Sequence, residues 1–196
     1  MESAVVIFAR VALMSVTLSA AGFAFGQDAA APDPTVDAME RQLETGRHER
    51  LISRIAEDGT FITGFTTDGC SGGLSAGWEY LSGRFPDFAA RHGTRPPWED
   101  CCVAHDRVYH SGGVDVADAS ESFEQRKAAD LELMSCVVAT GVRRSAELQS
   151  EYQLTESQVA LLYEAIAGLM YRSVRLGGVP CTVHPWRWGY GWPECR

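Results

Sequence analysis

The sequence predicts an all-α protein with a single domain, and three observations support this prediction. Apolar residues recur at helical spacing in three long segments. Beyond one short hairpin, no segment alternates apolar and polar residues as a half-buried strand would. The chain has 196 residues, 45% of them hydrophobic, which is enough for one domain with a core and an additional export segment.

Residues 1–26 have the features of an export signal peptide. Arg10 precedes an uncharged run from Val11 to Phe25, and Ala24-Phe25-Gly26 forms a small-x-small cleavage signal before Gln27. The alternative is an uncleaved anchor that starts as early as Ala4, which would suit a structural protein of the cell envelope. Arg10 interrupts that anchor, so we expect cleavage and a secreted or periplasmic protein.

Residues 27–35 are predicted to form a linker, because Pro32 and Pro34 discourage helix formation. The single domain would then cover residues 36–196. Its first element is predicted to be a charged amphipathic helix from Val36 to Glu57, which Asp58-Gly59 would end. The inward face of this helix would carry Met39, Leu43, Leu51, Ile52 and Ile55.

The middle of the chain is predicted to contain a loop, short helices and one longer helix. Residues 61–73 are rich in Gly, Thr and Ser and indicate a loop, and residues 74–97 indicate turns and short helices. The run from Pro96 to Asp100 opens a helix that Ser111-Gly112-Gly113 ends. On this helix Cys101, His105 and Tyr109 recur every four residues and therefore share one face.

Two further long helices are predicted. One would run from about Ser120 to Thr140, with Gly141 as its end. The other begins after Thr155, which has Gln158 three residues later in the spacing of a capping box, and stops at Gly177-Gly178.

Charge and cysteine content restrict the class of protein. The net charge of −9 argues against nucleic-acid binding and against electrostatic adsorption to anionic lipid, but it does not exclude docking through apolar and aromatic side chains. All six cysteines follow the signal segment, and an even number in an exported chain most simply indicates three disulfides.

A possible hydrolytic site combines His105, Asp106 and Asp130. A neutral imidazole can take a proton from water when an acceptor holds its other nitrogen, and Asp130 is the candidate acceptor. Asp106 can hold a divalent cation beside the substrate. Calcium prefers six to eight oxygen ligands, so backbone carbonyls must also converge, and the segment from Asp68 to Gly73 has the glycine content for such a turn.

These motifs resemble those of the secreted phospholipases A2. That family carries Cys-Cys-x-x-His-Asp-x-Cys-Tyr on one long helix, an Asp followed six residues later by Cys on a second, antiparallel helix, and a calcium loop around Cys-Gly-x-Gly-Gly. The corresponding segments here are Cys101 to Tyr109, Asp130 to Cys136, and Cys70 to Gly73. The resemblance covers about residues 65–140, and residues 141–196 form a C-terminal extension.

The resemblance implies calcium-dependent hydrolysis of the sn-2 ester of glycerophospholipids at a membrane interface, in a pair of antiparallel disulfide-linked helices with a calcium loop. His105 would be the general base, Asp130 its orienting carboxylate, and Tyr109 a hydrogen-bond donor to Asp130. The implied calcium ligands are Asp106, the carbonyls of Gly69, Ser71 and Gly73, and Asp68 as an additional ligand found in shorter bacterial relatives. The implied disulfides are Cys101–Cys136, Cys70–Cys102 and Cys181–Cys195.

The chain departs from the family pattern at several positions. Val108 and Ala129 both stand where the family has cysteines, so a whole bridge is missing together, which suits a true relative. Ser71 replaces the first glycine of the loop motif, and the segment from Leu74 to Asp100 is longer than in the common animal enzymes. A non-catalytic calcium-binding or toxin-like protein on the same scaffold is therefore the alternative function.

Two rival sites share the same residues. Gly69-Cys70-Ser71-Gly72-Gly73 satisfies the Gly-x-Ser-x-Gly motif of α/β-hydrolases, which needs a preceding strand and a large parallel sheet. Zinc could be bound by Cys101, Cys102, His105 and His110, although adjacent cysteines are not the usual ligand spacing.

The C-terminal segment from His184 to Trp192 is rich in aromatic residues, among them Trp186, Trp188 and Trp192. These rings either dock the protein on a lipid interface or pack on its own helices, and the sequence leaves both readings open. The sequence does not indicate an oligomeric state.

Overall fold

The computed structural model describes residues 34–70 and 73–195, which form six helices and no strand. In chain order the helices are α2 Pro34–Ile55, α3 Gly73–Arg84, α4 Pro86–His92, α5 Glu99–His110, α6 Ala119–Tyr152 and α7 Glu156–Gly177. The all-α prediction is confirmed for this part of the chain. The predicted signal peptide lies outside the described residues. Among the helices of residues 34–70 and 73–195, none combines the length and apolar character needed to span a membrane.

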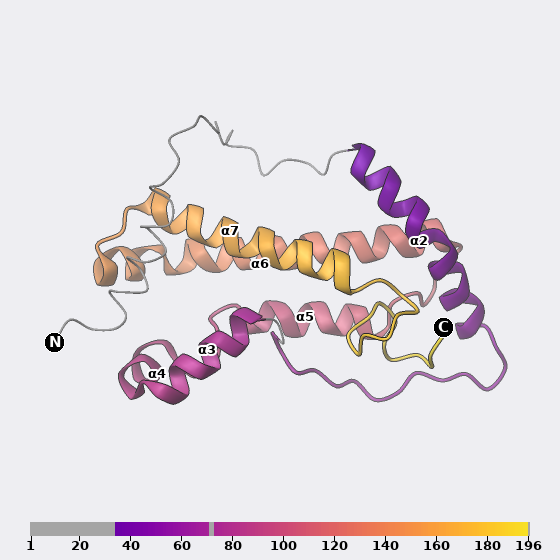
Figure 1. The fold of residues 1–196 in the computed structure, drawn as a ribbon, viewed down its shortest axis with the longest axis horizontal. Helices are drawn as coiled ribbons and strands as arrows, with labels where there is room; N and C mark the ends of the chain where they lie inside the picture. Colours follow the sequence, from indigo (N-terminus) through magenta and orange to yellow (C-terminus); the bar gives the residue numbers. More distant parts are fainter. Residues whose placement is uncertain (1–33, 71–72, 196) are drawn as a thin grey trace.

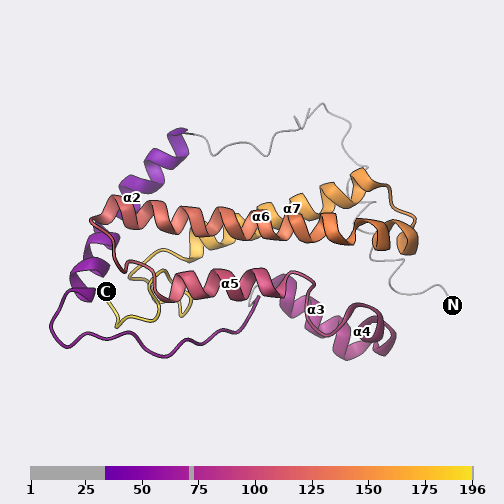
Figure 2. The ribbon, with the colours of Figure 1, turned by 180° about the vertical axis from the view of Figure 1, so that it is seen from behind.

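The long helix α6 is the centre of the fold (Figures 1 and 2). The helix α7 runs antiparallel beside it, α5 lies antiparallel along another side, and α2 crosses its N-terminal end. The helices α3 and α4 continue the α5 layer beneath the far ends of α6 and α7. The last residues fold back between the end of α7 and the end of α5, where the Trp188 N–H donates to the Gly178 carbonyl at 2.8 Å.

Helix α2 begins at Pro34, two residues before the predicted start, so Pro34 and Thr35 belong to the helix and not to the predicted linker. Proline is tolerated in the first turn of a helix because an N–H there has no intrahelical partner to lose. The helix ends at Ile55, close to the predicted end.

The buried face of α2 differs from the predicted apolar face. Leu51 is buried as expected, but Met39 is 62% and Leu43 is 72% exposed. Glu44 and His48 are buried in their place. The prediction for Met39 and Leu43 was wrong because the surface that receives α2 presents arginine side chains, which favour carboxylates over apolar groups.

Helix α6 continues past Gly141, its predicted end, to Tyr152, where Gln153 adopts a left-handed conformation with φ of 57°. A Cβ added to Gly141 would lie 2.4 Å from Cγ of Tyr163 on α7. Gly141 is therefore explained by the close approach of α7 and not by helix termination, and a helical glycine has both uses.

Helix α7 begins and ends where the sequence predicts. The Thr155 hydroxyl accepts from the Gln158 N–H at 3.3 Å, and the Gln158 side chain accepts from the Thr155 N–H at 2.8 Å, so the capping box is formed. The helix ends at Gly177. A Cβ on Gly178 would lie 2.6 Å from the ring of Tyr109, so the end of α7 packs directly on the candidate site.

The C-terminal aromatic segment packs largely on the protein. Trp188 is 1% exposed and its indole N–H donates to the Ser122 hydroxyl at 3.1 Å. Its ring contacts Tyr109 edge to face. Trp188 is thus unavailable to a lipid surface, whereas Trp186 is 42% exposed. The packing hypothesis holds for Trp188, and docking through Trp186 stays a prediction.

Alanine substitution of two helical glycines tests the packing of α7 on α6. Gly141→Ala should lower the free energy of unfolding by about 2 kcal/mol, because the new methyl group overlaps the Tyr163 side chain. Gly168→Ala on α7 is the matched control, since a Cβ there meets no atom within 4 Å, and it should be neutral or stabilising by up to about 1 kcal/mol. Urea denaturation measures both, and similar effects at the two positions would contradict this account.

Candidate active site

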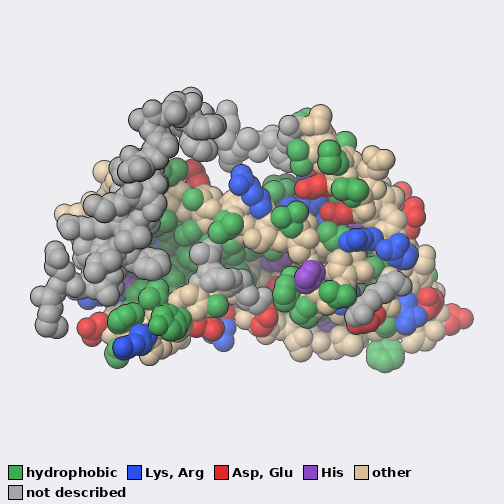
Figure 3. Space-filling model, in the orientation of Figure 1, with side chains coloured by type: hydrophobic (Ala, Val, Ile, Leu, Met, Phe, Trp, Pro, Cys, Tyr) green, Lys and Arg blue, Asp and Glu red, His purple; other side chains and the backbone are tan. Residues whose placement is uncertain are grey.

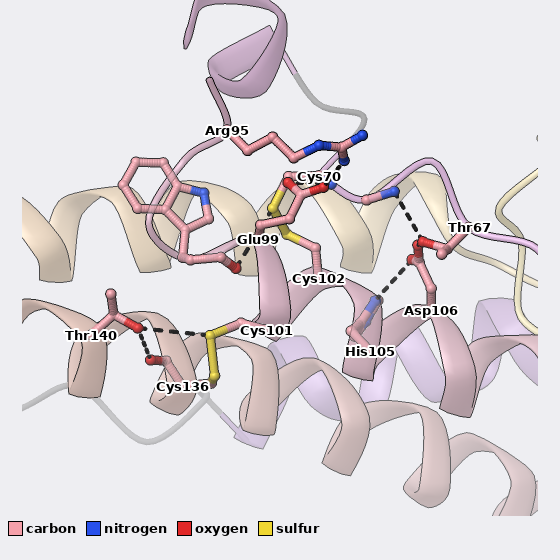
Figure 4. The surroundings of a disulfide bond; sticks show 12 residues. Thr67, Cys70, Arg95, Glu99, Cys101, Cys102, His105, Asp106, Cys136 and Thr140 are labelled. Atoms are coloured by element: carbon pink, nitrogen blue, oxygen red, sulfur yellow. Dashed lines mark hydrogen bonds and ion pairs between the residues drawn. A yellow bond between two sulfur atoms is a disulfide. The ribbon is translucent and has the colours of Figure 1, made fainter. Parts of the chain in front are cut away.

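Three disulfides hold the elements that carry the candidate residues, and they are the three expected pairs. Cys70–Cys102 fixes the loop before α3 to the start of α5, and Cys101–Cys136 joins α5 to α6 (Figure 4). Cys181–Cys195 closes the C-terminal segment. Two adjacent cysteines thus anchor α5 both to the loop and to its antiparallel neighbour.

His105 on α5 and Asp130 on α6 form a buried pair. His105 Nε2 lies 2.9 Å from Asp130 Oδ1, and the Tyr109 hydroxyl donates to the same oxygen at 2.6 Å. His105 is 8% exposed and Asp130 is fully buried. A carboxylate can only accept, so Nε2 carries the proton and the lone pair of Nδ1 is on the opposite side of the ring.

The Nδ1 side of the imidazole faces Asp106 and the loop. His105 Nδ1 lies 4.0 Å from Asp106 Oδ1, and the Thr67 hydroxyl donates to Asp106 Oδ2 at 2.5 Å (Figure 4). The same hydroxyl accepts from the Gly69 N–H at 2.9 Å. The segment before Cys70 is therefore tied to Asp106 on the side of the imidazole that is free to take a proton.

The electrostatics of the site raise the pKa of both His105 and Tyr109. Burial lowers the pKa of His105, but the neighbouring carboxylates of Asp106 and Asp130 outweigh burial and hold this pKa above its usual value. Burial and the charge of Asp130 raise the pKa of Tyr109 well above its usual value. Tyr109 therefore stays a hydrogen-bond donor, and the imidazolium is stabilised when it forms.

Arg175 near the end of α7 contacts the second oxygen of Asp130, a contact that the sequence did not reveal. Its Nη1 donates to Asp130 Oδ2 at 3.0 Å, and its Nη2 donates to Glu40 on α2 at 2.7 Å. Arg175 is 4% exposed. Asp130 is thus held by donors from two helices, and its orientation does not depend on His105 alone.

A second buried arginine supports Tyr109. Arg126 Nε donates to the Tyr109 hydroxyl at 3.2 Å, and its guanidinium also forms an ion pair with Glu44 on α2. Burial raises the pKa of Glu44, but hydrogen bonds from His48 and Arg126 outweigh this and lower it, so Glu44 stays ionised. The carboxylates of α2 therefore balance the two arginines behind the site.

Glu99 shapes the loop at Gly69. Gly69 has φ of +71°, and a Cβ there would lie 1.9 Å from Glu99 Oε1. The Cys70 N–H points to Glu99 Oε2 at 3.4 Å, and Arg95 forms an ion pair with the same carboxylate. Only glycine combines this backbone conformation with this close contact. The sequence motif includes Gly69 but gave no reason to connect it with Glu99.

The remaining expected calcium ligands are only partly described. Asp68 is exposed, and burial together with the charges of Asp106 and Asp68 raises the pKa of Tyr190 to about 12, so both carboxylates lie near this phenol. The Tyr190 hydroxyl donates to the Thr66 carbonyl at 2.7 Å and holds this segment in place. Ser71 lies outside the described residues, and Gly73 is the first residue of α3.

The two rival sites do not fit the structure. Cys101 and Cys102 are both in disulfides, so neither offers a thiolate to zinc. The described part of the chain has no strand to precede a nucleophile elbow, and Cys70 within that motif is bonded to Cys102.

No known protein-family model, characterised protein or solved structure matches this chain. The resemblance to secreted phospholipases A2 therefore stays an expectation from the sequence motifs.

Substitution of Arg175 tests the charge balance behind Asp130. Arg175→Gln should lower the free energy of unfolding by about 3 kcal/mol, because it leaves the fully buried Asp130 without this counter-ion. Arg172→Gln, at an exposed position on the same helix, should change it by less than about 0.5 kcal/mol. Chemical denaturation measures the difference, and equal effects would show that the Asp130 contact contributes little.

Proposed function

We propose that the protein is a calcium-dependent hydrolase that releases the fatty acid from the sn-2 position of glycerophospholipids. The observation that carries this proposal is the contact of His105 Nε2 with the buried Asp130 at 2.9 Å, while Nδ1 faces Asp106 and the loop. Asp130 sets the tautomer of His105, so Nδ1 is left free to accept a proton. This nitrogen faces Asp106, a carboxylate suited to a metal.

In the proposed mechanism, His105 Nδ1 accepts a proton from a water molecule as the water oxygen attacks the ester carbonyl. Asp130 stabilises the imidazolium through Nε2–H, and Tyr109 and Arg175 keep the carboxylate oriented. When the tetrahedral intermediate collapses, the same Nδ1 donates its proton to the departing glycerol oxygen. Because the nucleophile is water, no acyl-enzyme is formed.

The oxygen ligands proposed around Asp106 suit calcium, which prefers carboxylate and carbonyl oxygens. Asp106 would hold the ion together with the carbonyls of Gly69, Ser71 and Gly73, with Asp68 as an additional ligand. The contact between Thr67 and Asp106 supports this assignment, because it brings the loop to the carboxylate. Bound calcium would stabilise negative charge on the substrate carbonyl oxygen by several kcal/mol.

The proposed partner is a phospholipid membrane interface, and the proposed location is outside the cytoplasm. Three disulfides favour an oxidising compartment, which agrees with the predicted signal peptide. With a net charge of −9, contact with lipid would depend on apolar and aromatic side chains such as the exposed Trp186.

A hydrolysis assay tests the proposed chemistry. Phosphatidylcholine vesicles with a labelled sn-2 chain should release labelled fatty acid in the presence of calcium and not with a chelator. His105→Gln should reduce the rate by about 10²–10⁴-fold, because the base is lost. The exposed His184→Gln should leave the rate unchanged. Hydrolysis that persists with chelator, or in His105→Gln, would exclude this mechanism.

A thermal unfolding assay tests the metal site independently of turnover. Calcium at 100 times its Kd should stabilise the protein by about 2.7 kcal/mol and raise the Tm. Asp106→Asn should abolish this shift, because it removes the carboxylate that the ion needs. The exposed Asp115→Asn is the control and should retain the full shift. An undiminished shift in Asp106→Asn would place calcium elsewhere.

A further inference from the structure

A cavity of about 250 Å³ lies between α3 and α4 on one side and the ends of α6 and α7 on the other. Its walls are almost entirely apolar, and they include Trp78, Phe88, Trp98, Leu148, Leu162 and Tyr163. In Figure 3, hydrophobic side chains gather in a hollow on this part of the molecule. None of the candidate catalytic or metal-binding residues lines this cavity.

The size and lining of the cavity suit a slender apolar ligand. It is larger than a cavity of about 150 Å³ that holds benzene, and smaller than the roughly 300–1,000 Å³ of sites for drug-sized molecules. Leu162 is 44% and Phe85 is 37% exposed, so apolar surface in the walls is left open by the described part of the chain. Concave apolar surface of this kind marks ligand sites.

One polar group in the wall lacks a partner. Trp98 is 5% exposed, and its indole N–H is buried without an acceptor among the described residues. The same burial keeps this N–H out of reach of a ligand in the cavity, so it offers no donor to one. Other polar side chains in the wall are matched: the Tyr152 hydroxyl contacts His92 Nε2 at 2.5 Å, and Arg144 contacts the Tyr163 hydroxyl at 3.3 Å.

The acidic residues at the rim do not require a metal. Ligand atoms of His92, Glu147 and Glu151 lie within 4.8 Å of one another. Arg144, however, forms an ion pair with Glu147 at 2.8 Å, and Arg91 forms one with Glu151 at 3.2 Å. The Arg91–Glu151 pair and the contact between His92 and Tyr152 join α4 to α6 beside the apolar walls, whereas the Arg144–Glu147 pair lies within α6.

The cavity is separate from the His105–Asp130 pair. Trp98 precedes His105 by seven residues, which corresponds to about 10 Å along the axis of α5. Leu162 precedes Arg175 by thirteen residues, or about 20 Å along α7. The walls come instead from residues 78–98, from the C-terminal end of α6 and from the N-terminal half of α7.

We infer that this cavity binds the hydrocarbon part of a single acyl chain. Its walls are almost entirely apolar, which favours a slender hydrocarbon chain over polar or bulky ligands. Free fatty acids and the acyl chains of intact lipids share this chemistry. The inference does not depend on the hydrolysis proposed above, and the site would act without calcium.

Fluorescence quenching by dibrominated stearic acid, in the presence of a chelator, tests the inference. Trp78 and Trp98 line the cavity, so a brominated chain inside it should quench tryptophan fluorescence in a saturable manner. Leu162→Gln should weaken binding by about tenfold, because it places an amide in the apolar wall. Leu161→Gln is the matched control, since Leu161 is 64% exposed and does not line the cavity.

Vesicles of brominated phosphatidylcholine distinguish a free fatty acid from the acyl chain of an intact lipid. Quenching by the free acid identifies the free acid as ligand, and quenching by the vesicles but not by the free acid identifies the chain of an intact lipid.

Absence of saturable quenching with either ligand would overturn the inference, as would equal quenching in Leu161→Gln and Leu162→Gln. Because the measurement needs neither calcium nor turnover, its result is independent of the hydrolysis assay.

Discussion

Asp130 is the group on which the rest of the site depends. A carboxylate without solvent contact is tolerated only when charged partners and hydrogen bonds compensate for its lost hydration. Here one oxygen accepts from His105 and Tyr109, and the other accepts from Arg175. These donors come from α5 and α7, so the requirement to satisfy a single carboxylate fixes both helices relative to α6. The same requirement sets the tautomer of His105, and structural and chemical roles therefore coincide in one residue.

The arginines that satisfy this carboxylate must themselves be balanced, and α2 supplies the balance. Glu40 pairs with Arg175 and Glu44 pairs with Arg126. Three carboxylates (Glu40, Glu44 and Asp130) and two guanidiniums leave this group with one negative charge in excess. An excess of negative charge beside a buried imidazole stabilises its protonated form, which is the form that His105 would reach as the proposed general base. The polar inner face of α2 is thus explained by the site that it covers.

Prediction from the sequence succeeded where local spacing carries the information. Helical periodicity places His105 and Tyr109 on one face, and the observed cysteine pairs are those that the motif implies. It failed where the deciding partner is remote in sequence. Arg175 resembles an ordinary basic residue at the end of a helix, and nothing near it indicates a carboxylate 45 residues away. Gly141 similarly has two local interpretations, and only the ring of Tyr163 decides between them.

The long α6 also explains why the chain has an apolar cavity. The turns of α6 beyond Gly141 contribute Leu148 and Tyr152 to the cavity walls, and the close approach at Gly141 brings α7 against them. The opposite wall comes from α3 and α4. Two segments that are far apart in sequence therefore meet around one space. Had α6 ended at Gly141, the side chains of α3 and α4 in the cavity would lack the wall that Leu148 and Tyr152 form, so the two segments are best understood as parts of one feature.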